Sequence, residues 1–299
     1  MPFDIGLCVR DLMGSLTLLS MGRIQSSIGL FKASWAVLRQ DRELLLLPVI
    51  SALAAGLTIA LFALPVLATV DFDAVDAAGD STVGAGPLTA GLLALAYLVL
   101  AFISIFFNAA LAHAANERMD GGDPTVGSAL RGAASRTNRI LPWAIVSATV
   151  SFIISQIQRR GGVFGSILGF LGGMAWSAVT FLVLPILVIE DISVTEAVKR
   201  STGLLRSAWG EGLAGHIGLG IISFLAMIPL AIVAAVGASS GAAAVAIPLV
   251  AIAIVGFVGV LIVTSALSIV FQTALYRFAT SQPTASFERD LMQDAFRIR

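Results

Sequence analysis

Long apolar runs without any Asp, Glu, Lys or Arg constrain this chain more than any other feature. They cover residues 44–70, 88–112 and 161–189, and the run between 212 and 276 is long enough for two helices. A helix needs about 20 apolar residues to cross the hydrocarbon core of a membrane. Hydrophobic residues make up 58% of the chain and charged residues 12%, which excludes an ordinary soluble globular protein.

These runs predict an all-α polytopic membrane protein with six transmembrane helices. The stretch "ILPWAIVSATVSFIISQIQ" lies between Arg139 and Arg159 and is just long enough to cross. The segment "GASSG" at 237–241 divides the last run into two spans. The predicted spans are residues 44–70, 88–114, 140–158, 162–189, 212–236 and 242–276.

The positions of the basic residues orient these spans. With a cytoplasmic N-terminus, all of the 18 basic residues except Arg159 and Arg160 lie on the cytoplasmic side, as the positive-inside rule favours. A re-entrant third segment would invert every later loop and weaken this asymmetry, so six full spans fit better. We therefore expect a multi-pass protein of the cell (inner or plasma) membrane with both termini in the cytoplasm.

The spans belong to one predicted membrane domain, residues 21–281. Residues 1–20 are interpreted as an N-terminal extension rather than a secretory signal, because Asp4 and Arg10 interrupt the apolar core that a signal needs. The sequence leaves open whether Met1 or Met21 is the start. Residues 282–299 are expected to be a cytoplasmic tail.

Amphipathic helices are expected on the cytoplasmic side, at residues 23–40, 124–138 and 193–209. In the last of them Ser193 and Glu196 match a capping box, and Lys199 and Arg206 lie opposite an apolar face. A basic face together with an apolar face ending in Trp209 is typical of a helix lying in the membrane interface. A solvated elbow between two spans is the alternative.

The other two amphipathic segments repeat parts of this pattern. In the middle one, Asp123 is expected as the N-cap and Pro124 as the first helical residue. Each amphipathic helix precedes two spans, so three repeated units are one interpretation, and chance similarity is the other. The candidates for contact with the membrane interface are Trp35, Lys32, Arg39, Arg131, Lys199, Arg200, Arg206 and Trp209.

Glycines in the fourth span predict close packing between helices. Gly165, Gly169 and Gly173 recur every four residues, and Gly172 broadens the ridge. Such a ridge lets a neighbouring helix approach closely. An internal partner is favoured over a second copy of the chain, because six helices already supply neighbours.

No residue pattern points to an enzyme. The predicted spans contain no ionisable residue near the membrane centre, which weighs against ion-coupled transport. No nucleophile–base pair, phosphate-binding glycine loop or metal-ligand spacing is found, so we expect no catalytic site, cofactor or metal. A formal net charge of zero gives no indication of nucleic-acid binding.

Two patches resemble a known family: "FKASWAVLRQDRELLLLPVIS" at 31–51 and "VLPILVIEDISVTEAVKRSTGLLRSAWG" at 183–210. They are similar to uncharacterised six-helix membrane proteins of bacteria and archaea, themselves similar in pattern to the membrane domain of some glycerophosphodiester phosphodiesterases. The resemblance implies an architecture without a settled function, and the phosphodiesterase domain has no counterpart in this chain. The motif residues that it implies are Trp35, Arg39, Asp41, Pro48, Pro185, Glu190, Asp191, Lys199, Arg200 and Ser201.

These observations favour a non-catalytic membrane component that organises lipid or partner proteins through its basic cytoplasmic helices. The alternative is a permease or channel for a neutral or lipidic solute, with helices kinked at Pro185, Pro229 and Pro248 as the pathway. Anionic lipid head groups on the cytoplasmic side are the expected partner. A protein partner or a homo-oligomer stays open.

The six-span topology predicts which segments a membrane-impermeant thiol reagent reaches. Single cysteines placed within 71–87 or 237–241 should be labelled from outside the cell, and those within 120–135 or 195–207 only after the membrane is opened. Labelling at 195–207 in intact cells would contradict this topology.

Overall fold

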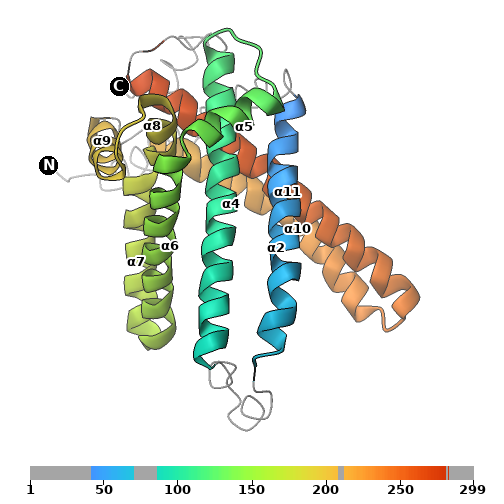
Figure 1. The fold of residues 1–299 in the computed structure, drawn as a ribbon. Coiled ribbons are helices and arrows are strands. Elements are labelled where there is room, and N and C mark those ends of the chain that lie inside the picture. The colour runs from blue at the N-terminus through green and yellow to red at the C-terminus, as the bar shows by residue number, and fades with distance from the viewer. Residues whose placement is uncertain (1–41, 71–85, 208–211, 281, 283–299) are drawn as a thin grey trace, which may run out of the picture. The chain divides into compact units, whose positions relative to one another are not determined.

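The computed structural model describes residues 42–70, 86–207, 212–280 and 282, and within them the protein is all-α, with helices and no strands (Figure 1). The predicted fold class is therefore confirmed. The helices are η1 (Arg42–Leu45), α2 (Leu46–Leu67), α4 (Pro87–Met119), α5 (Val126–Ser135), α6 (Thr137–Arg160), α7 (Gly162–Thr180), α8 (Val183–Glu190), α9 (Val194–Ser207), α10 (Gly212–Ser239) and α11 (Ala243–Ala279).

Five segments are long and apolar enough to cross a membrane, namely Glu43–Leu67, Pro87–Met119, Thr137–Arg160, Gly162–Glu190 and Ala243–Ala279. Each of them coincides with a predicted span. The remaining predicted span corresponds to α10, a helix of 28 residues in which Ser223–Ser239 forms a shorter apolar stretch. The prediction of apolar, membrane-type helices is confirmed.

Large apolar side chains cover the outer surfaces of these helices. Leu64 on α2 is 76% exposed, Val163 on α7 is 81% exposed, and Val255 on α11 is 72% exposed. Soluble monomers do not expose apolar surface on this scale. Such surfaces are stable where the surroundings are as apolar as the side chains, as in lipid.

The contacts divide the chain into two compact units. The first, which we call the α2–α9 unit, consists of Glu43–Glu117 and Asp123–Leu204. The second, the α10–α11 unit, consists, within the described part of the chain, of residues 42, 118–122, 205–207, 212–280 and 282.

In the α10–α11 unit, two helices form an antiparallel hairpin (Figure 1). Gly241 adopts a positive φ of 66° in the turn, a conformation that glycine takes without the steric cost of a Cβ atom. The hydroxyls of Ser223 on α10 and Thr264 on α11 are hydrogen-bonded at 2.9 Å. Such polar links contribute about 0.6 kcal/mol on average between membrane helices.

The fourth predicted span, 162–189, is broken rather than continuous. Helix α7 ends at Thr180, and α8 begins at Val183. Pro185 accounts for the break, because its ring would clash with the carbonyl of Phe181 four residues earlier. As the third residue of α8, it lacks an N–H where helical N–H groups are in any case unpaired.

The α6–α7 hairpin contains the glycine ridge, and its inner face packs against α6. Gly165 and Gly169 are buried. A Cβ atom on Gly165 would lie 2.5 Å from the carbonyl oxygen of Ile157, and one on Gly169 would overlap the side chain of Gln158. Gly173 and Gly172 leave more room: a Cβ on the first would lie 3.9 Å from Ile154, and one on the second would meet nothing within 4 Å. The space between α6 and α7 therefore narrows from Gly173 toward Gly165.

The contrast between Gly169 and Gly172 defines a test of this seam. Gly169→Leu should lower the stability of the detergent-solubilised protein by about 1–3 kcal/mol, because the new side chain forces α6 and α7 apart. Gly172→Leu is the matched control: it makes the same change in helix propensity but points into open space. Thermal melting measures both, and equal melting temperatures would show that the seam tolerates a large side chain.

Candidate functional site

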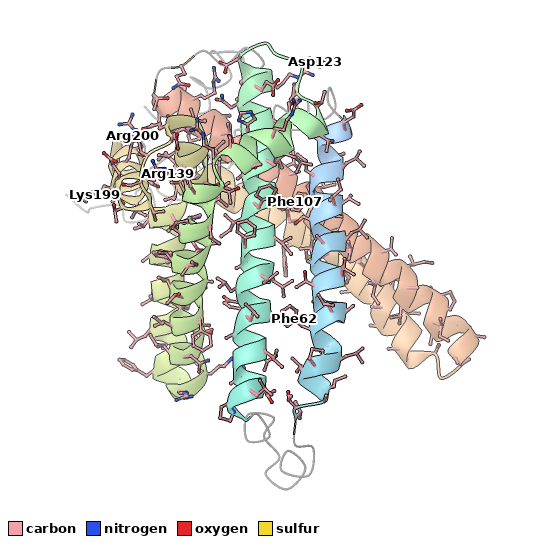
Figure 2. The ribbon with its side chains drawn as sticks, in the orientation of Figure 1. Phe62, Phe107, Asp123, Arg139, Lys199 and Arg200 are labelled. Atoms are coloured by element: carbon pink, nitrogen blue, oxygen red, sulfur yellow. The ribbon has the colours of Figure 1, made fainter. Side chains whose placement is uncertain are left out.

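Ion-paired side chains of the α2–α9 unit gather where α6 begins and where α8 passes into α9. Figure 2 shows Arg139, Lys199 and Arg200 at the same end of this unit. We call the connection between α8 and α9, residues 191–193, the elbow. The elbow cluster is the set of ion-paired side chains around it: Arg136, Arg139, Glu190, Asp191 and Arg200.

Asp191 ends α8 and turns the chain toward α9. Its φ of 54° is in the left-handed region, and it is the one residue other than glycine with a positive φ in the described part of the chain. Asp tolerates this conformation better than most residues. Its carboxylate forms an ion pair with Arg136 and accepts a hydrogen bond from Nε of Arg139 at 3.3 Å. The end of α8 is thereby tied to the start of α6.

Glu190 and Arg200 link α8 to α9. The Nε of Arg200 donates to Oε1 of Glu190 at 2.6 Å. The carboxylate is 19% exposed and the guanidinium side chain 48% exposed, so water still screens the pair and its contribution to stability is about 1 kcal/mol or less. The pair connects the last residue of α8 to the middle of α9.

Ser201 is the buried polar contact of this region. Its side chain is fully buried; its hydroxyl donates to the carbonyl of Val179 at 2.7 Å and accepts the N–H of Leu182 at 3.2 Å. In a continuous helix that carbonyl would accept from residue 183, and that N–H would donate to residue 178. One hydroxyl from α9 therefore pairs two of the backbone groups that the break leaves open.

The faces of α9 differ as its amphipathic pattern predicts. Ala197 and Ser201 are fully buried, whereas Glu196, Lys199 and Gly203 are exposed. At Ala197 and Ser201 the inner face is therefore covered by protein. The outward face carries the charges.

The N-terminus of α9 contains part of the expected capping box. The N–H of Glu196 donates to Oγ of Ser193 at 3.4 Å. The Glu196 carboxylate accepts from the same hydroxyl, also at 3.4 Å, rather than reaching the backbone of Ser193. The cap contacts are long, and the buried face holds α9 more firmly than they do.

The helix in the middle loop begins later than predicted. Thr125, not Asp123, is the N-cap, and Pro124 precedes the helix. The N–H of Ser128 donates to Oγ1 of Thr125 at 3.1 Å, and the N–H of Thr125 donates to Oγ of Ser128 at 3.0 Å. This reciprocal pair satisfies two N–H groups; a helix capped at Asp123 would place Val126, which has no acceptor, at the corresponding position.

Helix α5 packs on the polar end of α4 through small residues. Ala129 and Ala133 are fully buried, and the ring of His113 lies where a Cβ on Gly132 would be. One turn along α4, Oε2 of Glu117 accepts a hydrogen bond from Oγ of Ser128 at 3.0 Å. Arg131, a predicted interface residue, is exposed and donates through Nε to the carbonyl of Gly127 in its own helix at 3.2 Å.

The structure brings together one of the two motif patches. Pro185, Glu190, Asp191, Arg200 and Ser201 all lie at the break or the elbow, with Lys199 exposed beside them. Pro48 is partly buried near the start of α2. Trp35, Lys32, Arg39, Asp41 and Trp209, with the predicted helix 23–40, lie outside the described residues. Arg206 belongs to α9, but its side chain is outside the description.

One charged residue of the α10–α11 unit was not singled out by the sequence. The side chain of Arg277, near the end of α11, is 2% exposed, and its Nη2 donates to Oδ1 of Asp120 at 2.5 Å. Burial of a guanidinium group requires such a partner. The only sequence signal was an arginine closing a long apolar run, which also fits an exposed interface residue. Within the described residues, no group of three or more His, Cys, Asp or Glu side chains is placed to hold a metal ion.

Comparison with known proteins identifies a family but no characterised relative. A family model described as a family of unknown function (DUF6159) matches residues 88–286, more than half of the chain. The resemblance to an uncharacterised family is thereby confirmed. The match includes the patch at 183–210 and the whole elbow cluster, whereas the patch at 31–51 lies before it. No curated protein matches the chain.

Two substitutions separate the roles of Asp191. Asp191→Asn removes the charge but keeps a residue that tolerates a positive φ, so it should cost about 1 kcal/mol or less, as for partly exposed ion pairs. Asp191→Ala also places an ordinary residue in the left-handed conformation, which adds about 1–2 kcal/mol.

Thermal melting of the purified variants in detergent measures this difference. Glu196→Gln, which changes a charge on the exposed face of α9, is the control and should melt like the parent. Equal losses for the Asn and Ala variants would assign the whole effect of Asp191 to its ion pairs.

Proposed function

The chain belongs to the family of unknown function (DUF6159), and from this premise we propose that it is a non-catalytic, multi-pass membrane component that gathers anionic lipid on its cytoplasmic side. The observation that carries the proposal is the outward basic face of α9 beside the ends of two membrane-type helices. Lys199 and Arg200 are exposed there, while the opposite face of α9 is held by Ala197 and Ser201.

The proposal includes six spans in the cell membrane, with both termini in the cytoplasm. Its support for the sixth span is α10, which is long enough to cross at about 1.5 Å per residue and contains no Asp, Glu, Lys or Arg. With six spans the elbow and the α4–α5 connection lie on the side that holds most of the basic residues.

The depth of the elbow cluster favours contact with head groups. The apolar part of α6 begins at Ile140, so Arg136 and Arg139 lie within about one turn of it. Glu190 is the last residue of α8, directly after an apolar run. Charged side chains at this depth lie at the level of lipid phosphates.

Lys199 is the cation best placed to bind a phosphate. It is exposed, and among the described side chains it has no ion-pair partner, whereas Arg200 is paired with Glu190. A basic residue near an anionic surface adds about 1 kcal/mol of attraction. Several such residues on neighbouring elements would concentrate anionic lipid around the protein.

The elbow cluster also supports a role without catalysis. Its acids and bases pair with one another across α6, α8 and α9. Such pairs position helices, whereas an acyl- or phosphoryl-transfer site needs a nucleophile beside a base. A partner protein or a second copy of the chain remains a further candidate for the same basic surface.

The break between α7 and α8 favours a second candidate, a permease or channel for a neutral or lipidic solute. Discontinuous membrane helices form binding sites in many transporters because their free backbone groups contact the substrate. In this chain Ser201 already pairs two of those groups. These two groups are therefore already occupied in this conformation and do not offer a substrate site. The first proposal is favoured for this reason.

Lipid binding by α9 is testable with a peptide of residues 193–210. It should become helical on vesicles that contain phosphatidylglycerol and much less so on phosphatidylcholine alone. Changing Lys199 to Gln should weaken binding to the anionic vesicles by roughly fivefold, equivalent to about 1 kcal/mol. Circular dichroism and vesicle co-sedimentation measure both effects.

The control peptide carries Thr195→Ala, a change on the same exposed face without loss of positive charge. It should bind like the parent peptide. Equal helicity on the two kinds of vesicle would overturn the proposal that α9 recognises anionic lipid.

A further inference from the structure

The backbone groups at the break between α7 and α8 cannot all form hydrogen bonds within these two helices. Pro185 supplies no N–H, and its ring excludes a helical carbonyl at Phe181, so residues 178–185 cannot form an unbroken hydrogen-bond ladder. Val183 and Ile186 beyond the break are fully buried, and an unpaired backbone group among such apolar side chains is costly. The stability of the break therefore depends on a partner from elsewhere in the chain.

That partner is α9. Ser201 bonds both the carbonyl of Val179 and the N–H of Leu182, and Ala197, one turn earlier, is fully buried on the same face. Removing α9 would leave both backbone groups without these bonds. The position of α9 and the geometry of the break are thus one coupled system.

The same helix presents a basic group outward. Lys199 and Ser201 are two residues apart, about 200° around the helix axis, so they lie on nearly opposite faces. Lys199 is exposed and Ser201 is fully buried. Binding of a ligand to the exposed face of such a helix can therefore affect a contact on its buried face, one helix diameter away.

We propose that anionic lipid regulates the break between α7 and α8 through α9, with Ser201 as the coupling residue. The inference rests on the proposed binding of anionic lipid by α9. Lipid phosphate bound to Lys199 favours the conformation that presents this lysine outward, and in that conformation Ser201 is bonded to Val179 and Leu182. A ligand shifts an equilibrium toward the state that it binds better. Anionic lipid therefore favours the state in which Ser201 is bonded to the backbone at the break.

Hydrogen exchange of the full-length protein in vesicles tests the proposal. Exchange is measured by mass spectrometry in phosphatidylcholine alone and in an equal mixture with phosphatidylglycerol. In the parent, phosphatidylglycerol should slow exchange both in peptides from α9 and in peptides covering residues 179–188. Ser201→Ala should speed exchange at 179–188 by about tenfold, because the break loses a buried hydrogen-bond partner, and should abolish the effect of phosphatidylglycerol there.

A neighbouring hydroxyl provides the matched control. Thr202 bonds to the carbonyl of Val198 inside α9, so Thr202→Ala removes a hydroxyl from the same helix without touching the break. It should keep the parent's response to phosphatidylglycerol. Ser201→Cys, which keeps a weak donor in a similar volume, should give an intermediate exchange rate at 179–188 and shows that the effect follows the hydrogen bond.

The outcomes separate the two proposals. If α9 responds to phosphatidylglycerol and residues 179–188 do not, lipid binding stands and the coupling is overturned. If Ser201→Ala leaves the lipid response at 179–188 intact, Ser201 is not the coupling residue and the inference fails. If α9 itself exchanges equally in both lipids, the proposed function fails, and lipid regulation of the break fails with it.

Discussion

In the hydrocarbon core of a membrane, every backbone N–H and C=O group needs a partner from within the protein. A continuous helix without an internal proline meets this requirement along its length, as α4 does. The break between α7 and α8 does not, and there the side chain of Ser201 supplies bonds to Val179 and Leu182. The position of α9 in the α2–α9 unit follows from this need, because a hydroxyl can reach the break only if its helix packs against it.

Charged groups at the ends of the helices obey a related constraint. A charge near the membrane must remain hydrated or find a partner. Asp191 combines both, since its side chain is partly exposed and contacts Arg136, which precedes α6, and Arg139 in its first turn. Arg277 in the α10–α11 unit is the extreme case, a buried guanidinium held by Asp120. These ion pairs are local within each unit.

Small residues decide how closely these helices approach. Membrane helices gain little from the hydrophobic effect when they associate, because lipid is as apolar as their side chains. Close packing replaces it: Gly169 contacts the side chain of Gln158, Gly132 contacts the ring of His113, and Ala197 on the inner face of α9 is fully buried. The ridge on α7 is a local property of the sequence. Its neighbour, α6, is the adjacent segment of the chain, joined through Gly161.

The sequence by itself determined the class of protein and the position of its apolar helices, because length and hydropathy are local properties that each segment carries alone. It also indicated that residues 183–210 matter, through a resemblance, and that α9 has a charged face. Only the tertiary structure decided what these residues contact. Ser201 lies 22 residues from Val179 along the chain, and Arg139 lies 52 residues from Asp191. No helical period reports contacts over such separations. The sequence indicated a kink at Pro185 but not an interruption, since the apolar run continues through Phe181 without a change in composition, and a lone proline is compatible with either. Whether freed backbone groups are tolerated depends on a side chain from another helix, which the packed structure alone places there.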